Sequence, residues 1–261
     1  MSRLTHSTTA DGIAVVTLAN PPMNAMDACL LEELASLFEG FAGDHGVRAA
    51  VVAAEGPAFS AGLDLKSVPQ LDRPGQRRLV GALNDGFGTL YAWPKPLVAA
   101  VNGHAIAGGL ILALCADWRV AADVAMQVSL AEVRVGVTFP VAPLEVARGE
   151  LAPSLARRLI LLGEALDAHG AEKLGVFDEL VPAGDLLAQA IEQARRHASL
   201  PPRTFAITKG QLRSQSLERI AAARAGQGEP RLIDWLGEET RRASQAVLRA
   251  AASVRRSVRR A

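Results

Sequence analysis

At residues 101–109 the chain reads Val101-Asn102-Gly103-His104-Ala105-Ile106-Ala107-Gly108-Gly109. The apolar residues before this stretch predict a buried strand, and the apolar run after it predicts a helix that ends near Ala116. Glycine at the start of a helix lets the backbone approach a ligand without a Cβ in the way. The first N–H groups of a helix are free and carry partial positive charge. The stretch therefore indicates a turn and a helix start that suit an anionic oxygen.

A second loop of small residues precedes this one in the chain. Residues 59–66 read Phe59-Ser60-Ala61-Gly62-Leu63-Asp64-Leu65-Lys66 and follow an apolar segment that predicts a strand. Either loop alone is typical of an ordinary turn, and Asp64 alone could be a helix N-cap. The two loops together, in this order, are a much more specific pattern.

The two loops resemble those of the crotonase family. The turn Asn20-Pro21-Pro22-Met23-Asn24-Ala25-Met26 is similar to an early turn of the same family, and residues 161–182 are similar to a later block in order and spacing. The resemblance covers roughly residues 10–200. It implies an α/β fold, a crotonase-like spiral of β-β-α units, followed by a helical C-terminal region.

The resemblance also implies a division of the chain and an assembly. Residues 1–200 would form the spiral core, and residues 201–261 would form a helical trimerisation region that begins at Pro201-Pro202. The helices of this region carry apolar side chains that a short appendage cannot bury alone. We expect a homotrimer or a dimer of trimers, whose substrate is an acyl-CoA.

The family's active site implies roles for seven residues. The backbone near Ala25, Ala61, Asp64 and Leu65 would hold CoA, while the N–H groups of Leu63 and Gly108 would bind the thioester oxygen. Backbone donors aimed at a developing oxyanion stabilise it whatever the side chain is. The CoA thioester is then the substrate, and no cofactor or metal is expected.

The reaction depends on which carboxylates accompany this oxyanion site. Family hydratases have two glutamates: the first position is Ile111 here, and the second is matched by Glu132. Hydration by that route needs both carboxylates, whereas moving a double bond needs one base that removes a proton and returns it. A single carboxylate in an apolar pocket has a raised pKa that suits this task. We therefore favour Δ3,Δ2-enoyl-CoA isomerase chemistry, with Glu132 as the catalytic residue and Ile111 making the pocket drier.

Several alternatives stay open at this point. Hydratase activity could survive if Glu132 handled water alone, or if another carboxylate such as Glu145 entered the pocket. Glu132 could instead form a surface ion pair with Arg134. From another class, the chain could be a non-catalytic acyl-CoA-binding protein, or its basic end, residues 254–260, could bind RNA. That end is short and lacks interleaved aromatic residues, which argues against nucleic acid.

Composition limits the remaining possibilities. With 49% apolar residues the chain can bury a large core, and 28 basic against 27 acidic side chains leave no strong field towards nucleic acid or a membrane. Two cysteines form no disulfide framework, which fits a reducing, cytoplasmic location. No apolar run is long enough to span a bilayer. We expect residues 72–74 to be a polar loop and residues 72–80 to form part of the pocket wall.

Overall fold

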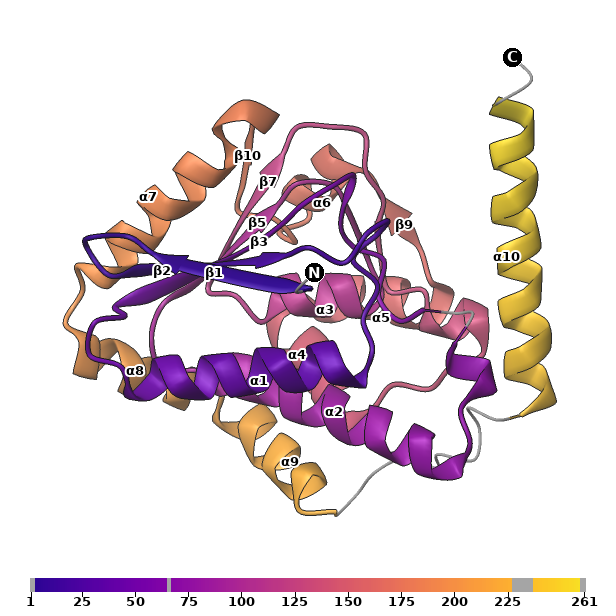
Figure 1. The fold of residues 1–261 in the computed structure, drawn as a ribbon, viewed down its shortest axis with the longest axis horizontal. Helices are drawn as coiled ribbons and strands as arrows, with labels where there is room; N and C mark the ends of the chain where they lie inside the picture. Colours follow the sequence, from indigo (N-terminus) through magenta and orange to yellow (C-terminus); the bar gives the residue numbers. More distant parts are fainter. Residues whose placement is uncertain (1–2, 65–66, 227–236, 259–261) are drawn as a thin grey trace.

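Two β-sheets organise the protein in a computed structural model that describes residues 3–64, 67–226 and 237–258 (Figure 1). The larger sheet has the order β1-β2-β3-β5-β7-β10, in which only the β1–β2 pair is antiparallel. The smaller sheet has the order β4-β6-β8-β9. The strands are β1 (Leu4–Thr8), β2 (Ile13–Leu18), β3 (Ala49–Ala54), β4 (Ala58–Ser60), β5 (Leu97–Val101), β6 (His104–Ile106), β7 (Trp118–Ala122), β8 (Val128–Ser129), β9 (Ala165–Leu166) and β10 (Glu179–Val181).

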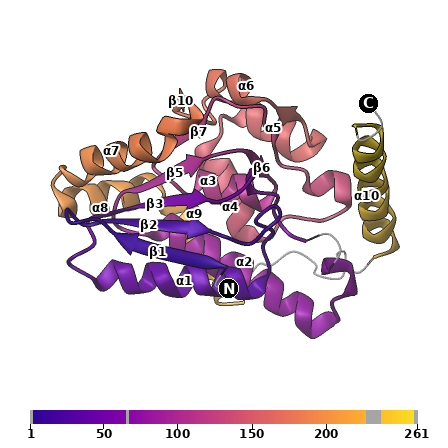
Figure 2. The ribbon, with the colours of Figure 1, turned by 45° about the horizontal axis from the view of Figure 1, so that its top comes forward.

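Ten α-helices and three short 3₁₀ helices connect and cover these sheets within the described residues. Figure 2 shows most of them gathered around the strands, with α10 standing at the side. They are α1 (Ala28–Gly43), α2 (Arg73–Ala92), α3 (Gly108–Leu114), α4 (Val141–Glu150), α5 (Pro153–Leu162), α6 (Ala168–Lys173), α7 (Leu186–Ala198), α8 (Pro202–Leu212), α9 (Ser214–Arg224), α10 (Glu238–Val258), η1 (Val68–Gln70), η2 (Glu132–Val135) and η3 (Ala183–Asp185).

The chain repeats one pattern three times. A strand joins the larger sheet, the next strand joins the smaller sheet, and a helix follows: β3-β4-α2, β5-β6-α3 and β7-β8-α4. The second strands of the three repeats, β4, β6 and β8, pair in parallel. The connections that follow them therefore meet at the same edge of the smaller sheet. The predicted α/β spiral of β-β-α units is confirmed, and the loops after β4 and β6 are brought together by it.

The central strands β3 and β5 of the larger sheet are buried on both faces. Val51 and Val98 lie in the cluster beneath α7, whereas Val52 and Ala99 point into the main core. Successive side chains of a strand point to opposite faces, and parallel strands covered on both sides are apolar throughout. This explains why the strands read as continuous apolar runs rather than alternating ones.

The start of α2 differs from the prediction. Residues 72–74 are not a polar loop: Asp72 is the N-cap of α2, and its carboxylate accepts a 2.8 Å hydrogen bond from the N–H of Gly75. Pro74 lies in the first turn, where its missing N–H costs nothing. Polar residues that looked like a break in the pattern are therefore a helix start.

The C-terminal helices pack on the core. Ile220 of α9 is buried, Leu217 is partly buried against the core, and α10 contacts η2. In contrast, Leu212 at the end of α8 is 85% exposed. Leu232 and Trp235, which also carry the apolar pattern of this region, lie outside the described residues. Across the described ranges, no helix has the length and apolar character needed to cross a membrane.

Candidate active site

The two loops predicted to carry the chemistry are in direct contact. Gly62 has a φ of +75°, and a Cβ built on it would lie 3.0 Å from the nitrogen of Gly108 and 2.9 Å from the carbonyl oxygen of Ile106. Only glycine combines this backbone conformation with such a close approach. The first loop therefore lies directly against the start of α3.

Buried polar groups hold the first loop in shape. Asn24 donates through Nδ2 to the carbonyl oxygens of Glu55 and Ala58, both at 2.8 Å. The Ser60 hydroxyl donates to the carbonyl oxygen of Asn24 at 2.7 Å and accepts from the N–H of Gly62 at 3.1 Å. Buried polar groups that are fully paired in this way fix one conformation. Ser60 thus has a structural task, since its hydroxyl is occupied by the backbone.

The second loop carries strain at the residue before α3. Ala107 has φ 52° and ψ −123°, a conformation that L-residues rarely adopt. Its N–H donates to the carbonyl oxygen of Ser129 at 2.8 Å, and its carbonyl accepts from Leu110 and Ile111. Among the hydrogen bonds of the described residues, neither the N–H of Gly108 nor that of Leu63 has an acceptor. Both donors are therefore available to a ligand.

A cavity of about 380 Å³ is lined by the two residues that carry these donors and by one acidic residue. Leu63, Gly108 and Glu132 all line it, and Glu132 is the single acidic residue among its described lining. Most of the other lining residues are apolar, among them Val68, Leu83, Phe87, Val137, Phe139 and Pro143. The structure thus brings together the three residues predicted to be catalytic, from three separate segments of the chain.

Glu132, the first residue of η2, has an isolated carboxylate. Its Oε2 atom is shielded from solvent and has no hydrogen-bond partner among the described residues. Burial raises the pKa of Glu132 to about 8, since removing water disfavours the charged form. The alternative of an ion pair with Arg134 is wrong, because the Arg134 Nε donates instead to the carbonyl oxygen of Leu162 at 3.2 Å. A carboxyl group of this kind can both accept and donate a proton near neutral pH.

Glu145 lies elsewhere. It is buried in α4, where its carboxylate pairs with Arg148 at 2.9 Å and with Arg219 at 3.0 Å. It does not line the cavity. Its ion pairs hold α4 against α9, so it is separated from the oxyanion donors.

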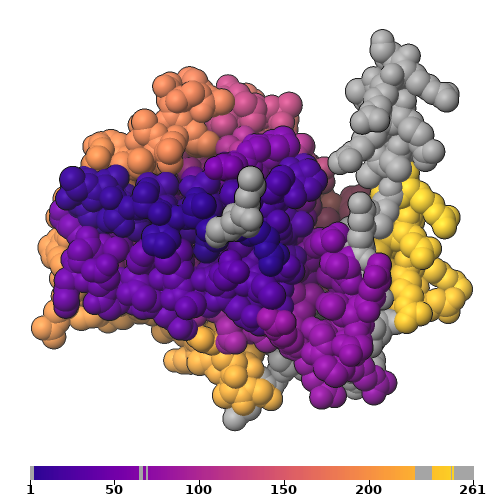
Figure 3. All heavy atoms as spheres, in the orientation of Figure 1, coloured from indigo at the N-terminus to yellow at the C-terminus, as the bar shows by residue number. Residues whose placement is uncertain are grey.

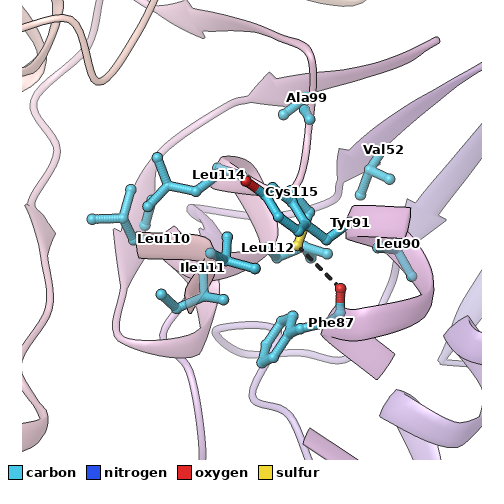
Figure 4. Packing of buried hydrophobic residues seen from close by; sticks show 14 of the residues in the cluster. Val52, Phe87, Leu90, Tyr91, Ala99, Leu110, Ile111, Leu112, Leu114 and Cys115 are labelled. Atoms are coloured by element: carbon cyan, nitrogen blue, oxygen red, sulfur yellow. Dashed lines mark hydrogen bonds between the residues drawn. The ribbon is translucent and has the colours of Figure 1, made fainter. Parts of the chain in front are cut away.

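The position that would hold a hydratase's other glutamate is part of the core. Ile111 is fully buried, and Figure 4 shows it packed among side chains of α2 and α3. It lies one turn into α3 and is not among the cavity-lining residues. The expectation that Ile111 dries the pocket by lining it is therefore wrong.

The cavity wall also differs from the prediction. Residues 72–80 do not line the cavity. The wall comes instead from Val68 of η1 and from Leu83 and Phe87, further along α2. Because α2 begins at Arg73, its first two turns lie beyond the cavity and its middle faces it.

Of the four residues predicted to hold CoA, Ala61 is among the residues that line the cavity. The Ala25 carbonyl accepts from Asn20 Nδ2 at 2.7 Å, and the Asp64 carbonyl accepts from the N–H groups of Ser67 and Val68, both at 3.1 Å. Leu65 lies outside the described residues.

Three further lining residues were not predicted. Gln127, Phe139 and Val247 come from a connection after β7, the segment before α4, and α10 respectively. Gln127 Nε2 donates to the Ser129 hydroxyl at 3.2 Å. None of the three follows a motif, so only their packing identifies them.

Comparisons with known proteins agree with this fold. Residues 8–233 match the model of the enoyl-CoA hydratase/isomerase family. The probable enoyl-CoA hydratase EchA17 of Mycobacterium tuberculosis is 31% identical over 236 residues, covering 83% of this chain and 87% of that protein.

Solved structures give the same result. The probable enoyl-CoA hydratase EchA3 of Mycobacterium tuberculosis aligns with a TM-score of 0.78 at 30% identity, covering 86% of this chain and 94% of that chain. Human mitochondrial delta3-delta2-enoyl-CoA isomerase aligns with a TM-score of 0.88 over 97% of this chain and 99% of that chain, at 24% identity, a likeness of fold alone. This chain is therefore an enzyme of the enoyl-CoA hydratase/isomerase family.

Proposed function

We propose that this protein is a Δ3,Δ2-enoyl-CoA isomerase in which Glu132 is the only proton-transferring group. The supporting observation is the isolated Glu132 carboxyl in an apolar cavity that also contains the free N–H groups of Leu63 and Gly108. The CoA thioester is the substrate, and its CoA part would contact the backbone near Ala25, Ala61, Asp64 and Leu65. No cofactor is needed, since the reaction only moves a proton and a double bond.

The reaction would proceed in two proton transfers. The Glu132 carboxylate removes a proton from C2 of a 3-enoyl thioester, and the electron pair moves onto the thioester oxygen to form a dienolate. The N–H groups of Leu63 and Gly108 stabilise that oxyanion, an effect worth about 3 kcal/mol for each donor. The Glu132 carboxyl then returns the proton to C4, and the product is the 2-enoyl thioester. The raised pKa of Glu132 favours both transfers, because a carboxyl group with a pKa near neutral pH can both remove a proton and return it.

Hydration is the competing reaction in this family. It would need a group that activates water, and the described lining of the cavity contains no carboxylate besides Glu132. Ile111 stands at the position of the first glutamate of family hydratases, and it is buried in the core. That position therefore supplies no carboxylate to the site, which supports the same conclusion. The proposal therefore ranks isomerisation above hydration.

The decisive experiment compares two substrates. We expect the wild type to isomerise a 3-enoyl-CoA faster than it hydrates crotonyl-CoA. Glu132→Gln should lower isomerisation by roughly 100- to 10,000-fold, the usual effect of removing a general base. Binding of a saturated acyl-CoA should change little, since the shape of the cavity is kept.

Glu145→Gln is the matched control. It removes a buried carboxylate that does not line the cavity, so isomerisation per folded enzyme should stay within a few-fold of wild type. Brisk hydration of crotonyl-CoA without isomerisation, or full turnover by Glu132→Gln, would refute the proposal.

A further inference from the structure

The C-terminal helix α10 contributes one side chain, Val247, to the cavity that contains Glu132. Figure 3 shows the described part of α10, in yellow, beside the body of the molecule. Its docking is made by one face of the helix. Thr240, Ser244 and Val247 follow the spacing i, i+4 and i+7, which places them on the same side of a helix.

Two hydroxyl groups fix α10 on η2. The Thr240 Oγ1 donates to the carbonyl oxygen of Gly136 at 2.6 Å, and the Ser244 Oγ donates to that of Val135 at 3.3 Å. Both residues are at most 2% exposed. These carbonyls belong to the end of η2, where a helix leaves acceptors unpaired. The register of α10 along η2 is therefore set by specific hydrogen bonds.

Gly136 allows the two helices to approach this closely. It has a φ of +69°, and a Cβ built on it would lie 3.0 Å from the Cα of Thr240. The neighbouring residues Arg241, Arg242 and Gln245 are exposed, so the docked face is narrow. Once Thr240 and Ser244 are in place, the next residue on that face is Val247, at the cavity.

Val247 lies where the cavity meets solvent. It lines the cavity yet remains 37% exposed, whereas the Glu132 Oε2 is shielded. A methylene group occupies about the volume of a water molecule, ~30 Å³, so about 380 Å³ has room for roughly thirteen groups of that size, the reacting carbons included. An acyl chain that extends from the reacting carbons past Glu132 would reach the α10 side of the cavity.

We infer that α10 forms the outer wall of the acyl site and that Val247 determines how long an acyl chain the enzyme accepts. The substrate class is a medium-chain acyl-CoA whose end contacts Val247. This inference rests on the proposed function only in taking an acyl-CoA as the ligand. It does not depend on which reaction Glu132 performs.

The test measures chain-length preference in full-length variants. Dissociation constants are measured for hexanoyl-CoA and decanoyl-CoA, and kcat/KM for hex-3-enoyl-CoA and dec-3-enoyl-CoA. Val247→Trp should weaken decanoyl-CoA binding by about tenfold or more and leave hexanoyl-CoA within about twofold, as expected when a pocket loses room for a few methylene groups. Val247→Ala should shift the kcat/KM ratio towards the longer substrate by about fivefold.

Gln245→Trp is the matched control, since it adds the same side chain to an exposed position on the same helix. It should keep the wild-type preference. If Val247→Trp and Gln245→Trp bind both acyl-CoAs like the wild type, the inference is wrong while the proposed function stands. If Val247→Trp selectively loses decanoyl-CoA but the wild type does not isomerise, the proposed reaction is wrong and the inference stands.

Discussion

A Cβ built on Gly109 would lie 2.1 Å from the carbonyl oxygen of Ser60. The second residue of α3 thus packs directly on the backbone of the first loop, with no room for a side chain. Since Leu63 follows Ser60 and Gly108 precedes Gly109 on these same two segments, this contact holds the two free N–H donors at a fixed spacing. The oxyanion site is therefore a product of backbone packing.

Gly109→Ala is expected to separate the two loops and lower turnover by about 100-fold, the scale of a 1 Å displacement in an active site. Gly81→Ala in α2 is the control, because a Cβ there has no neighbour within 4 Å. Steady-state kinetics on a 3-enoyl-CoA measures both. Equal turnover of the two variants would show that the loop contact does not position the donors.

Gly108→Pro removes one donor at the first position of α3, where the missing N–H breaks no hydrogen bond of the helix. Turnover on any acyl-CoA substrate should fall by about 100-fold or more. Gly108→Ala keeps the N–H, and its Cβ would meet only ordinary contacts, 3.5 Å from Met26 Sδ and 3.6 Å from Phe87. Most activity should therefore remain in Gly108→Ala, and a folded Gly108→Pro enzyme with wild-type turnover would refute the site.

The raised pKa of Glu132 predicts a pH profile. The base form of the free enzyme is the carboxylate, which is a minority below pH 8 because burial raises the pKa of Glu132 to about 8. The kcat/KM for isomerisation should therefore increase with pH and level off above about pH 8. A profile that is flat from about pH 6 to about pH 9 would argue against Glu132 as the base.

The same pKa predicts that Glu132 destabilises the fold at high pH. The unfolded carboxyl ionises at a pKa of about 4.5, whereas the folded one ionises at about 8. The free energy of unfolding therefore falls as pH increases between these two values. Glu132→Gln does not ionise. It should increase the free energy of unfolding by on the order of 5 kcal/mol at about pH 9, and by little below about pH 4. Denaturant unfolding at the two pH values measures this, and an equal effect at both would contradict it.

Exposed apolar side chains predict self-association. Leu200, Ile207 and Leu212 are 46%, 52% and 85% exposed around α8. Exposed apolar residues close together mark protein interfaces, and we expect a trimer or a dimer of trimers. Sedimentation should show this at micromolar concentration, and Leu212→Glu should weaken it, while a stable wild-type monomer would count against it.

The resemblance of the two loops to the crotonase family made much of the fold and the oxyanion site predictable, and local backbone rules supported it. Gly62 has a positive φ that few other residues adopt, and Gly109 lies where a Cβ would meet the carbonyl oxygen of Ser60, so glycine at these two positions marks the turn and the close approach. Apolar runs predicted β3, β5 and α3. Asp72 was misjudged because a capping aspartate and a loop aspartate look alike without the hydrogen bond that it accepts.

The sequence by itself thus determined the apolar strands and helices of the core, and its resemblance to the crotonase family implied the β-β-α spiral, the two facing loops, and Glu132 as the candidate base. Only the tertiary structure decided that Glu132 is isolated, that Ile111 is in the core, and that Val247 reaches the cavity. Backbone conformation and hydrophobic patterning are local properties, encoded within a few residues. Desolvation of a carboxyl and the shape of a cavity are sums over atoms from distant segments, and they exist only once those segments have packed.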